Sequence, residues 1–265
     1  MPPEGQLGLC RARRMVGGEV VDDNYGCITS LALDPIEKKP LAQFMPGSKV
    51  LSVGSYGCNL RCPFCQNASI ACAGPDDVLW REVTPEALAD KALELAPAGN
   101  IGVAFTYNEP LVGYEFVRDT AREVHARGLK NVLVSNGYVN EGPLSQLLPL
   151  IDAANIDLKG FTEDFYRWVG GDLATVKRTI EMMAATPTCH LEVTTLVIPG
   201  KNDSPEEIVA AAQWLASLDE AIVYHITRFF PCHRCQDRPA TPVRTVYALA
   251  DMARQYLPNV YAGNC

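Results

Sequence analysis

The sequence predicts an α/β fold in which helices cover a mostly parallel sheet. Six apolar runs of strand length occur, at residues 49–54, 101–107, 131–135, 154–158, 190–198 and 221–228. Helical segments follow them near residues 85–96, 113–127, 143–151, 173–185 and 205–218, with a last one at 242–256. Repeated strand–helix units favour parallel strands joined by right-handed crossovers, and nearly continuous apolar strands are typical of sheets covered on both faces. These patterns leave an open doubly wound sheet and a partial barrel as alternatives.

Local signals mark several helix ends and suggest how the chain is divided. Thr84 and Ser204 each precede a proline and then a glutamate, which places a capping hydroxyl before a rigid first turn. Gly128 is suited to end the helix before it. We expect an N-terminal extension at residues 1–48, a barrel core at 49–230, and a cysteine-containing segment with the final helix at 231–265.

The N-terminal extension is irregular but contains three recognisable features. Gly17 and Gly18 separate two short apolar stretches and predict a hairpin turn. Residues 27–33 are a candidate strand. Residues 34–40 carry mixed charges and prolines towards both ends, so we expect a loop on the solvated surface rather than a functional element.

The composition argues against several classes of function. A formal net charge of −8 disfavours nucleic-acid and membrane-surface partners, because both favour a basic face. The first residues lack the basic and apolar parts of a signal peptide, and no apolar stretch is long enough to cross a bilayer. Ten cysteines without a secretory signal indicate reduced thiols or metal ligands rather than disulfides. We therefore expect a cytoplasmic protein.

Three cysteines, Cys58, Cys62 and Cys65, follow the first apolar strand with the spacing Cys-x3-Cys-x2-Cys. Thiolates hold iron–sulfur clusters, and one loop can wrap a cluster when its ligands recur every few residues. A [4Fe–4S] cube held by three cysteines has one iron open to an outside ligand. Zinc and incidental thiols are the alternatives, but a structural zinc site needs a fourth ligand and usually two Cys-x2-Cys pairs. The loop predicts a [4Fe–4S] site, which suggests a low-oxygen setting.

The cysteine loop resembles the signature of the radical S-adenosylmethionine (radical SAM) superfamily, including the aromatic Phe64 before the last cysteine. In that superfamily the amino and carboxylate groups of S-adenosylmethionine (SAM) chelate the open iron. The resemblance implies a partial (β/α)6 barrel with a short irregular N-terminal extension. It also implies that SAM binds at the carboxyl ends of the strands, where barrel enzymes collect their active-site groups, with Phe64 near the adenine.

The second and third strands end in polar residues that the resemblance assigns to SAM. Glu109 matches an acid that follows two glycines in many relatives and holds the SAM amino group; here Tyr107 and Asn108 replace the glycines. A polar cap on the following helix is the alternative for Asn108 and Glu109. Asn136 lies in a Ser-Asn-Gly segment that resembles the Thr-Asn-Gly of glycyl-radical activating enzymes, and an ordinary turn is its alternative.

The last three strands carry the remaining candidates for SAM binding. Asp157 and Lys159 are two residues apart, so they point to the same side of an extended segment. They either bind the SAM ribose and carboxylate, as the resemblance to activating enzymes implies, or form a structural ion pair. Thr195 lies in a strand that resembles the one packed on the adenine. His225 is either a further SAM contact or a satisfied core residue.

Residues after the sixth strand suggest a second site. Arg228 is a candidate for facing the substrate pocket. Cys232 and Cys235 form a Cys-x2-Cys pair, a plausible half of a metal site. With Cys265 and either Cys10 or Cys27, the pair could form a second cluster or a redox pair. Scattered thiols are the favoured alternative.

The whole pattern resembles the radical SAM enzymes of the AmmeMemoRadiSam system, which are relatives of pyruvate formate-lyase activating enzyme. The segments that carry this resemblance are residues 34–40, 65–67, 106–110, 135–138, 157–159 and 237–239. It implies that a flavodoxin- or ferredoxin-type donor supplies one electron and that SAM is cleaved to methionine and a 5′-deoxyadenosyl radical. The radical then abstracts hydrogen from an unidentified substrate, for which a protein is one candidate. The alternatives are an activase for a glycyl-radical enzyme and a non-catalytic iron–sulfur or zinc protein.

Overall fold

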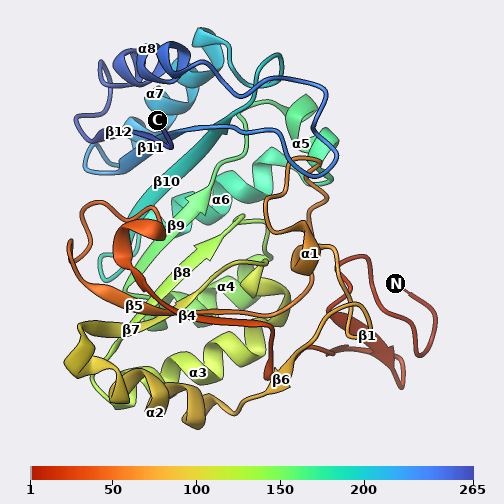
Figure 1. The fold of residues 1–265 in the computed structure, drawn as a ribbon. Helices are drawn as coiled ribbons and strands as arrows, with labels where there is room; N and C mark the ends of the chain where they lie inside the picture. Colours follow the sequence, from red (N-terminus) through yellow and green to blue (C-terminus); the bar gives the residue numbers. More distant parts are fainter. Residues whose placement is uncertain (1) are drawn as a thin grey trace.

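A curved sheet of eight strands forms the centre of the molecule in the computed structural model, which describes residues 2–265. Seven strands run parallel, and β4 at one edge is antiparallel to β5. From edge to edge (Figure 1), the strands are β12 (Val260–Gly263), β11 (Val223–Arg228), β10 (His190–Val197), β9 (Ala153–Asp157), β8 (Lys130–Ser135), β7 (Asn100–Phe105), β5 (Lys49–Gly54) and β4 (Ser30–Pro35).

The six strands expected of the barrel core are all present, with ends within two residues of the predicted ones. The strand expected at residues 27–33 is divided between β3 (Cys27–Ile28), which pairs with β6 (Arg81–Glu82), and β4. Strand β12 was not predicted. In the described part of the chain, β4 and β12 are the two edges of the sheet and do not pair with each other. The sheet therefore curves without closing, and the prediction of a partial barrel is confirmed.

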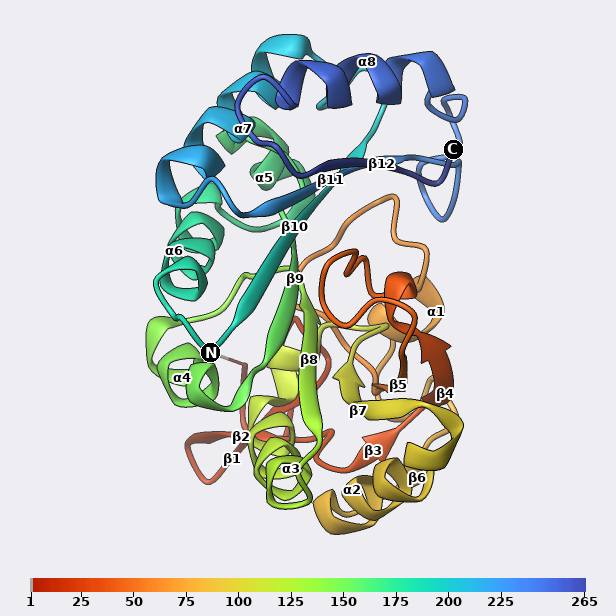
Figure 2. The same ribbon diagram turned by 90° about the vertical axis from the view of Figure 1, so that its left-hand side faces the viewer.

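The longer helices cover the convex face of the sheet, whereas α1 lies on the side of the segment between β4 and β5 (Figure 2), and two helices start at the predicted caps. Thr84 accepts a hydrogen bond from Ala87 N at 3.2 Å, and Ser204 accepts one from Glu207 N at 3.2 Å, which confirms both predicted caps. The short helices α1 and α5 were not predicted. The helices are α1 (Ala68–Ala71), α2 (Pro85–Glu94), α3 (Tyr114–Ala126), α4 (Glu141–Leu147), α5 (Glu163–Val169), α6 (Leu173–Ala184), α7 (Pro205–Leu218) and α8 (Val243–Ala253).

The two faces of the sheet have different environments because side chains alternate along each strand. On β10, Leu191 and Val193 belong to the main apolar core between the strands and the helices. Thr194, the next residue, lines a cavity on the concave side. Figure 2 shows helices α3, α4 and α6 on one side of the strands and the segment between β4 and β5 on the other. The position of a residue within its strand therefore decides whether it reaches the core or the cavity.

Residues 36–48, which we call the plug, fill part of the concave side. Ile36 and Leu41 of the plug are fully buried, and they form an apolar cluster with four inward-facing strand residues, Val50, Ala104, Val132 and Ala153. The side-chain amide of Asn155 on β9 also donates a hydrogen bond of 2.7 Å to Pro40 O. The plug therefore closes the interior beneath the cavity, and Pro40, Leu41 and Ala42 form part of the cavity wall.

Two charged residues at the start of the plug region are buried, so the prediction of a solvated loop at 34–40 was wrong for them. Asp34 is 9% exposed and Lys39 is 3% exposed. The Asp34 carboxylate accepts hydrogen bonds from Lys39 Nζ at 2.9 Å and from the Tyr107 hydroxyl at 2.7 Å. Lys39 Nζ also lies 4.7 Å from the centre of the Tyr107 ring. The sequence does not show whether the opposite charges of residues 34–40 face solvent or pair with one another in the interior, which explains the error.

The remainder of the N-terminal region forms a small unit beside the sheet. The hairpin predicted at Gly17 and Gly18 is confirmed, with β1 (Arg13–Val16) antiparallel to β2 (Glu19–Asp22). The division of the chain at residues 48 and 230 stays a prediction. Every helix within residues 2–265 is too short or too polar to cross a membrane.

Replacing Lys39 with methionine should lower the free energy of unfolding by about 3 kcal/mol, because it leaves the buried Asp34 carboxylate without its cation. Lys38→Met is a matched control. Lys38 approaches the same carboxylate at 3.3 Å, but its side chain is 67% exposed, so the control should change stability by less than about 0.5 kcal/mol. Urea denaturation at neutral pH measures both. Equal losses in the two variants would contradict the importance of burial for this pair.

Candidate functional site

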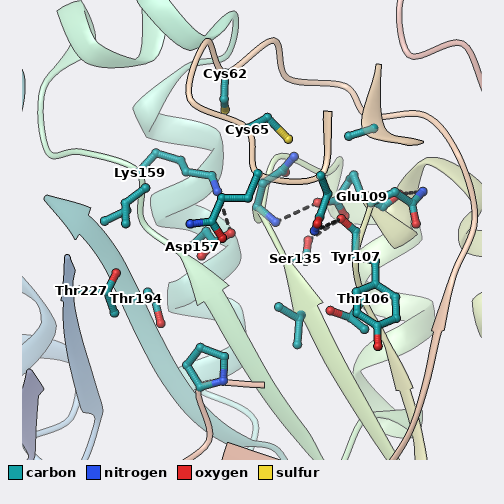
Figure 3. Close-up of a pocket in the computed structure, with 18 of the residues that line it drawn as sticks. Cys62, Cys65, Thr106, Tyr107, Glu109, Ser135, Asp157, Lys159, Thr194 and Thr227 are labelled. Atoms are coloured by element: carbon teal, nitrogen blue, oxygen red, sulfur yellow. Dashed lines mark hydrogen bonds and ion pairs between the residues drawn. The ribbon is translucent and has the colours of Figure 1, made fainter. Parts of the chain in front are cut away.

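A cavity of about 480 Å³ opens on the concave side, at the carboxyl ends of the parallel strands. Cys58, Cys62 and Cys65 line it from the loop after β5. Figure 3 shows Cys62 and Cys65 on one side of this space, with labelled polar residues from the strand ends facing it. Those strand-end residues in the lining include Thr106, Glu109, Ser135, Asn136, Asp157, Lys159, Thr194, His225 and Thr227. The structure thus brings most of the predicted site residues together.

The cysteine loop is held in place by backbone contacts from distant parts of the chain. Gly57, with φ +89°, opens the loop, and a Cβ at this position would lie 2.5 Å from the carbonyl oxygen of Cys10. Cys58 N donates to the same carbonyl at 3.1 Å, and Arg61 N donates to Val169 O at 2.7 Å. Only glycine fits the first position, because a side chain would be both strained and overlapping. The N-terminal region and α5 together fix the path of the loop.

The three thiols line the cavity without being grouped around one point in the described residues. Within residues 2–265, no three His, Cys, Asp or Glu side chains converge closely enough to hold one ion. A single zinc ion needs its ligands around one point, whereas the thiolates of a cube each bind a different iron. Burial raises the pKa of the Cys62 thiol to about 11, and it raises the pKa values of Cys58 and Cys65 as well. A bound metal centre would favour the thiolate forms.

Glu109 is buried at the cavity wall and is oriented by three donors. Its Oε1 accepts hydrogen bonds from Ser135 Oγ at 2.8 Å and Leu111 N at 3.0 Å, and its Oε2 accepts one from Asn136 N at 2.8 Å. Burial raises the pKa of Glu109 to about 7, although these hydrogen bonds oppose the shift. The hydrogen bond from Leu111 N caps the turn that follows. Glu109 therefore acts as the polar cap that the sequence offered as an alternative, and it also lines the cavity.

Asn108 and Asn136 both support the cysteine loop with their side chains. Asn108 Nδ2 donates to the carbonyls of Tyr56 and Gly57, at 3.1 Å each. Asn136 Nδ2 donates to Asn59 Oδ1 at 2.9 Å and lies 3.6 Å from Cys58 Sγ. These contacts tie the exits of β7 and β8 to the loop. A direct contact of either amide with SAM stays a prediction.

Asp157 and Lys159 form an ion pair of 2.6 Å at the exit of β9, and both line the cavity (Figure 3). Burial acts against the Lys159 ammonium, but the charges of Asp157 and of Cys62 outweigh it, so the pKa of Lys159 is raised above its ordinary value. The same ammonium acts to lower the pKa values of Cys62 and Cys65. The pair is therefore both a structural ion pair and part of the cavity's electrostatics.

Two predicted residues face away from the cavity. Thr195 Oγ1 donates to Leu158 O at 2.8 Å and accepts from the Tyr224 hydroxyl at 2.8 Å, behind the sheet. Arg228 Nε donates to Thr241 O at 2.7 Å. The residues immediately before them, Thr194 and Thr227, line the cavity instead. The alternation along both strands agrees with this placement, since Thr194 on β10 and His225 and Thr227 on β11 continue a series of polar residues separated by apolar ones.

His225 lies on the cavity wall and is also satisfied within the protein, so both interpretations of it apply. Its Nε2 contacts Glu192 Oε2 at 2.5 Å, and its ring stacks on Tyr261 with centroids 5.6 Å apart. Glu192 is fully buried and was not predicted as a site residue. Since Glu192 and His225 belong to different strands, no local motif identifies the pair.

Phe64 is buried and belongs to an aromatic cluster. Its ring centroid lies 5.4 Å from that of Trp168 and 6.0 Å from that of Phe165. Both partners belong to α5, the helix that the sequence did not predict. Phe64 also lines the cavity, so the position implied for it near the adenine is compatible with the structure and stays a prediction.

Among residues 2–265, the cysteines outside the loop do not form a second group around one point. Cys232 Sγ donates to Phe64 O at 3.1 Å, and Cys235 is buried below it. Cys265 is exposed. Cys10 packs against a small apolar cluster that contains Cys27. The structure offers no support for a second metal site. Cys72, which lies outside the predicted motif, lines the main cavity and is exposed.

Comparison with known proteins gives a consistent picture. Residues 52–215 match the Radical SAM superfamily. An uncharacterized protein of Methanocaldococcus jannaschii is 37% identical, covering 98% of this chain and 77% of that protein. The benzylsuccinate synthase activating enzyme of Thauera aromatica is 30% identical over 53% of this chain, which spans only 42% of that enzyme. A domain of pyruvate-formate lyase-activating enzyme from Bacteroides vulgatus has a similar fold, with a TM-score of 0.54, 18% identity, and coverage of 62% of this chain and 99% of that one.

Gly57→Ala should lower the free energy of unfolding by more than about 2 kcal/mol, because the added Cβ combines a left-handed backbone with overlap on the Cys10 carbonyl. Gly99→Ala is the matched control. Gly99 has φ +90°, but a Cβ added there would have no atom within 4 Å, so only the backbone penalty of about 1 kcal/mol applies. Urea denaturation compares the two, and equal losses would contradict the tight contact.

Proposed function

This chain belongs to the Radical SAM superfamily, and we propose that it cleaves SAM reductively with a [4Fe–4S] cluster held by Cys58, Cys62 and Cys65. When bound, the cluster supplies the electron that splits SAM into methionine and a 5′-deoxyadenosyl radical, which abstracts hydrogen from a substrate. The observation that carries the proposal is that the three thiols and the polar strand exits line one cavity. A protein that only carried electrons would need the thiols but not the polar strand exits.

Burial raises the pKa values of all three thiols, and two neighbouring groups act in the opposite direction, towards the thiolate forms. The Lys159 ammonium acts to lower the pKa values of Cys62 and Cys65, and Asn136 Nδ2 lies 3.6 Å from Cys58 Sγ. A positive charge and an amide donor both stabilise negative sulfur. The chain's own groups thus complement the charge of the cluster that we propose.

We assign the polar residues at the strand ends to different parts of SAM. Glu109 is held by three donors, so its carboxylate is oriented before an ammonium arrives. Asp157 and Lys159 supply an acceptor for a ribose hydroxyl and a cation for the methionine carboxylate. We assign Phe64 and His225 to the adenosyl part of SAM. Thr194 takes the place first assigned to Thr195, because Thr194 faces the cavity.

The electron and the substrate come from outside this chain in our proposal. The electron donor is a one-electron carrier of flavodoxin or ferredoxin type. The substrate is unidentified. The resemblance to the AmmeMemoRadiSam enzymes stays a prediction, as does the low-oxygen setting.

An activase for a glycyl-radical enzyme is the second candidate. It is favoured by the relatives named as activating enzymes, of benzylsuccinate synthase and of pyruvate formate-lyase. This chain spans 42% and 61% of those two relatives, so their partners transfer to it only as a hypothesis. In this case the hydrogen would be taken from a glycine of a partner protein.

Cys62→Ala should reduce both the iron bound per chain and the yield of 5′-deoxyadenosine to background, because the cluster loses one of its three protein ligands. The anaerobically reconstituted protein is mixed with SAM and dithionite, and 5′-deoxyadenosine is measured by liquid chromatography. The Cys232→Ala/Cys235→Ala variant should keep iron and cleavage within about twofold of the parent, as expected of thiols outside the cluster. Cleavage by Cys62→Ala at the parent rate would refute the proposal.

The activase hypothesis predicts a glycyl radical on a partner protein. The reconstituted chain, SAM and a reductant are mixed anaerobically with a glycyl-radical enzyme encoded beside this chain, and the sample is examined by electron paramagnetic resonance. A glycyl doublet that requires both SAM and Cys62 supports an activase. SAM cleavage without a doublet would instead support another substrate.

A further inference from the structure

Glu192 on β10 holds four hydrogen-bond donors with one buried carboxylate. Its Oε1 accepts from Gln43 N at 2.9 Å and is 2.8 Å from His190 Nε2. Its Oε2 accepts from Ala42 N at 2.9 Å and is 2.5 Å from His225 Nε2. Two donors therefore come from the plug and two from histidines, with one of each kind on each oxygen.

This arrangement determines where the histidines carry their protons. Burial alone would raise the pKa of Glu192, but the hydrogen bonds from both histidines and both backbone groups outweigh it and lower the pKa to about 2. An ionised carboxylate only accepts hydrogen bonds. His190 and His225 must therefore both donate from Nε2. In a neutral imidazole the other nitrogen, Nδ1, is then an acceptor.

Thr194, which pairs with His225 in the register of β10 and β11, also has a polar atom without a partner among the described residues. Within residues 2–265, His225 Nδ1 has no hydrogen-bond partner, and neither does the buried Thr194 Oγ1. Thr194 is the direct neighbour of His225 across the β10–β11 pair, and both residues line the cavity. Thr194 Oγ1 is buried, and buried polar atoms normally have partners. Both atoms are therefore suited to hydrogen-bonding a bound molecule.

We propose that Glu192 is a positioning residue that fixes His225 in its Nε2–H form, so that Nδ1 accepts a hydrogen bond from an N–H or O–H group of SAM in the cavity. The same carboxylate accepts hydrogen bonds from Ala42 N and Gln43 N of the plug. Glu192 therefore positions both the His225 acceptor and the plug residues at the cavity floor. This inference rests on the proposed function, because it takes SAM as the occupant of the cavity.

The first test separates the two nitrogens of His225. In His225→Gln, the amide nitrogen can still donate to Glu192, but the ring acceptor is lost. We expect the dissociation constant for SAM, measured by anaerobic calorimetry on the reconstituted chain, to rise about tenfold, the upper range for one hydrogen bond. His190→Gln retains a donor to the other carboxylate oxygen and should stay within about twofold of the parent. Unchanged affinity in His225→Gln, or equal loss in both variants, would overturn the inference.

The second test asks whether Glu192 acts through His225. We expect Glu192→Gln and His225→Gln each to weaken SAM binding, and the double variant to be no weaker than the more affected single one, because coupled groups are not additive. Fully additive losses would overturn the positioning role. Should Glu192→Gln fail to fold, the His225→Gln comparison and the measurement below still decide.

The third measurement observes the proton directly. The chain contains four histidines, so two-bond ¹H–¹⁵N spectra of histidine-labelled protein are simple, and the His225 signal is assigned by its loss in His225→Gln. When the ring is neutral, we expect its proton on Nε2. An Nδ1–H ring would overturn the inference. A parent chain that shows the Nε2–H ring but has no affinity for SAM would instead refute the proposed function.

Discussion

The concave side of an incomplete barrel has to be filled, and much of this structure follows from that requirement. In a closed barrel, layers of inward side chains fill the interior. Here the plug does so, and its Ile36 and Leu41 pack against Ala104 and Ala153 on the strands. Small strand residues and large plug residues give close packing. Lys39 of the plug also reaches Asp34 of β4, and together with Tyr107 it satisfies the buried carboxylate.

The cysteine loop depends on contacts that cross the whole chain. The carbonyl oxygen of Cys10 accepts a hydrogen bond from Cys58 N, and the carbonyl oxygen of Val169 accepts one from Arg61 N. Tyr107 O accepts a hydrogen bond of 2.7 Å from Asn67 Nδ2. Each contact orders backbone rather than a thiol, so the sulfur atoms are oriented by the path of the chain. Sites held in this way are preorganised, since little conformational freedom is left to lose when a cofactor binds.

The sequence predicts the strand–helix order, the helix caps and the three cysteines, because these depend on local patterns. It places Glu109, Asp157 and Lys159 correctly at the cavity, since strand exits of a parallel sheet meet at one edge. The structure places Thr194 and Thr227 at the cavity in place of Thr195 and Arg228, in agreement with the alternation of polar and apolar residues along β10 and β11, which the predicted residues did not follow. The sequence patterns also miss Glu192, whose partners His225 and Ala42 are brought together only by the tertiary fold.

The plug has one more consequence, which concerns the depth of the cavity. Pro40, Leu41 and Ala42 form the floor beneath the cavity, while the cysteine loop forms a separate part of its wall. Shortening the plug would deepen the cavity, and lengthening it would make the cavity shallower, without altering the spacing of Cys58, Cys62 and Cys65. The depth of the cavity can therefore vary in this architecture while the three cysteines keep their places on the loop after β5.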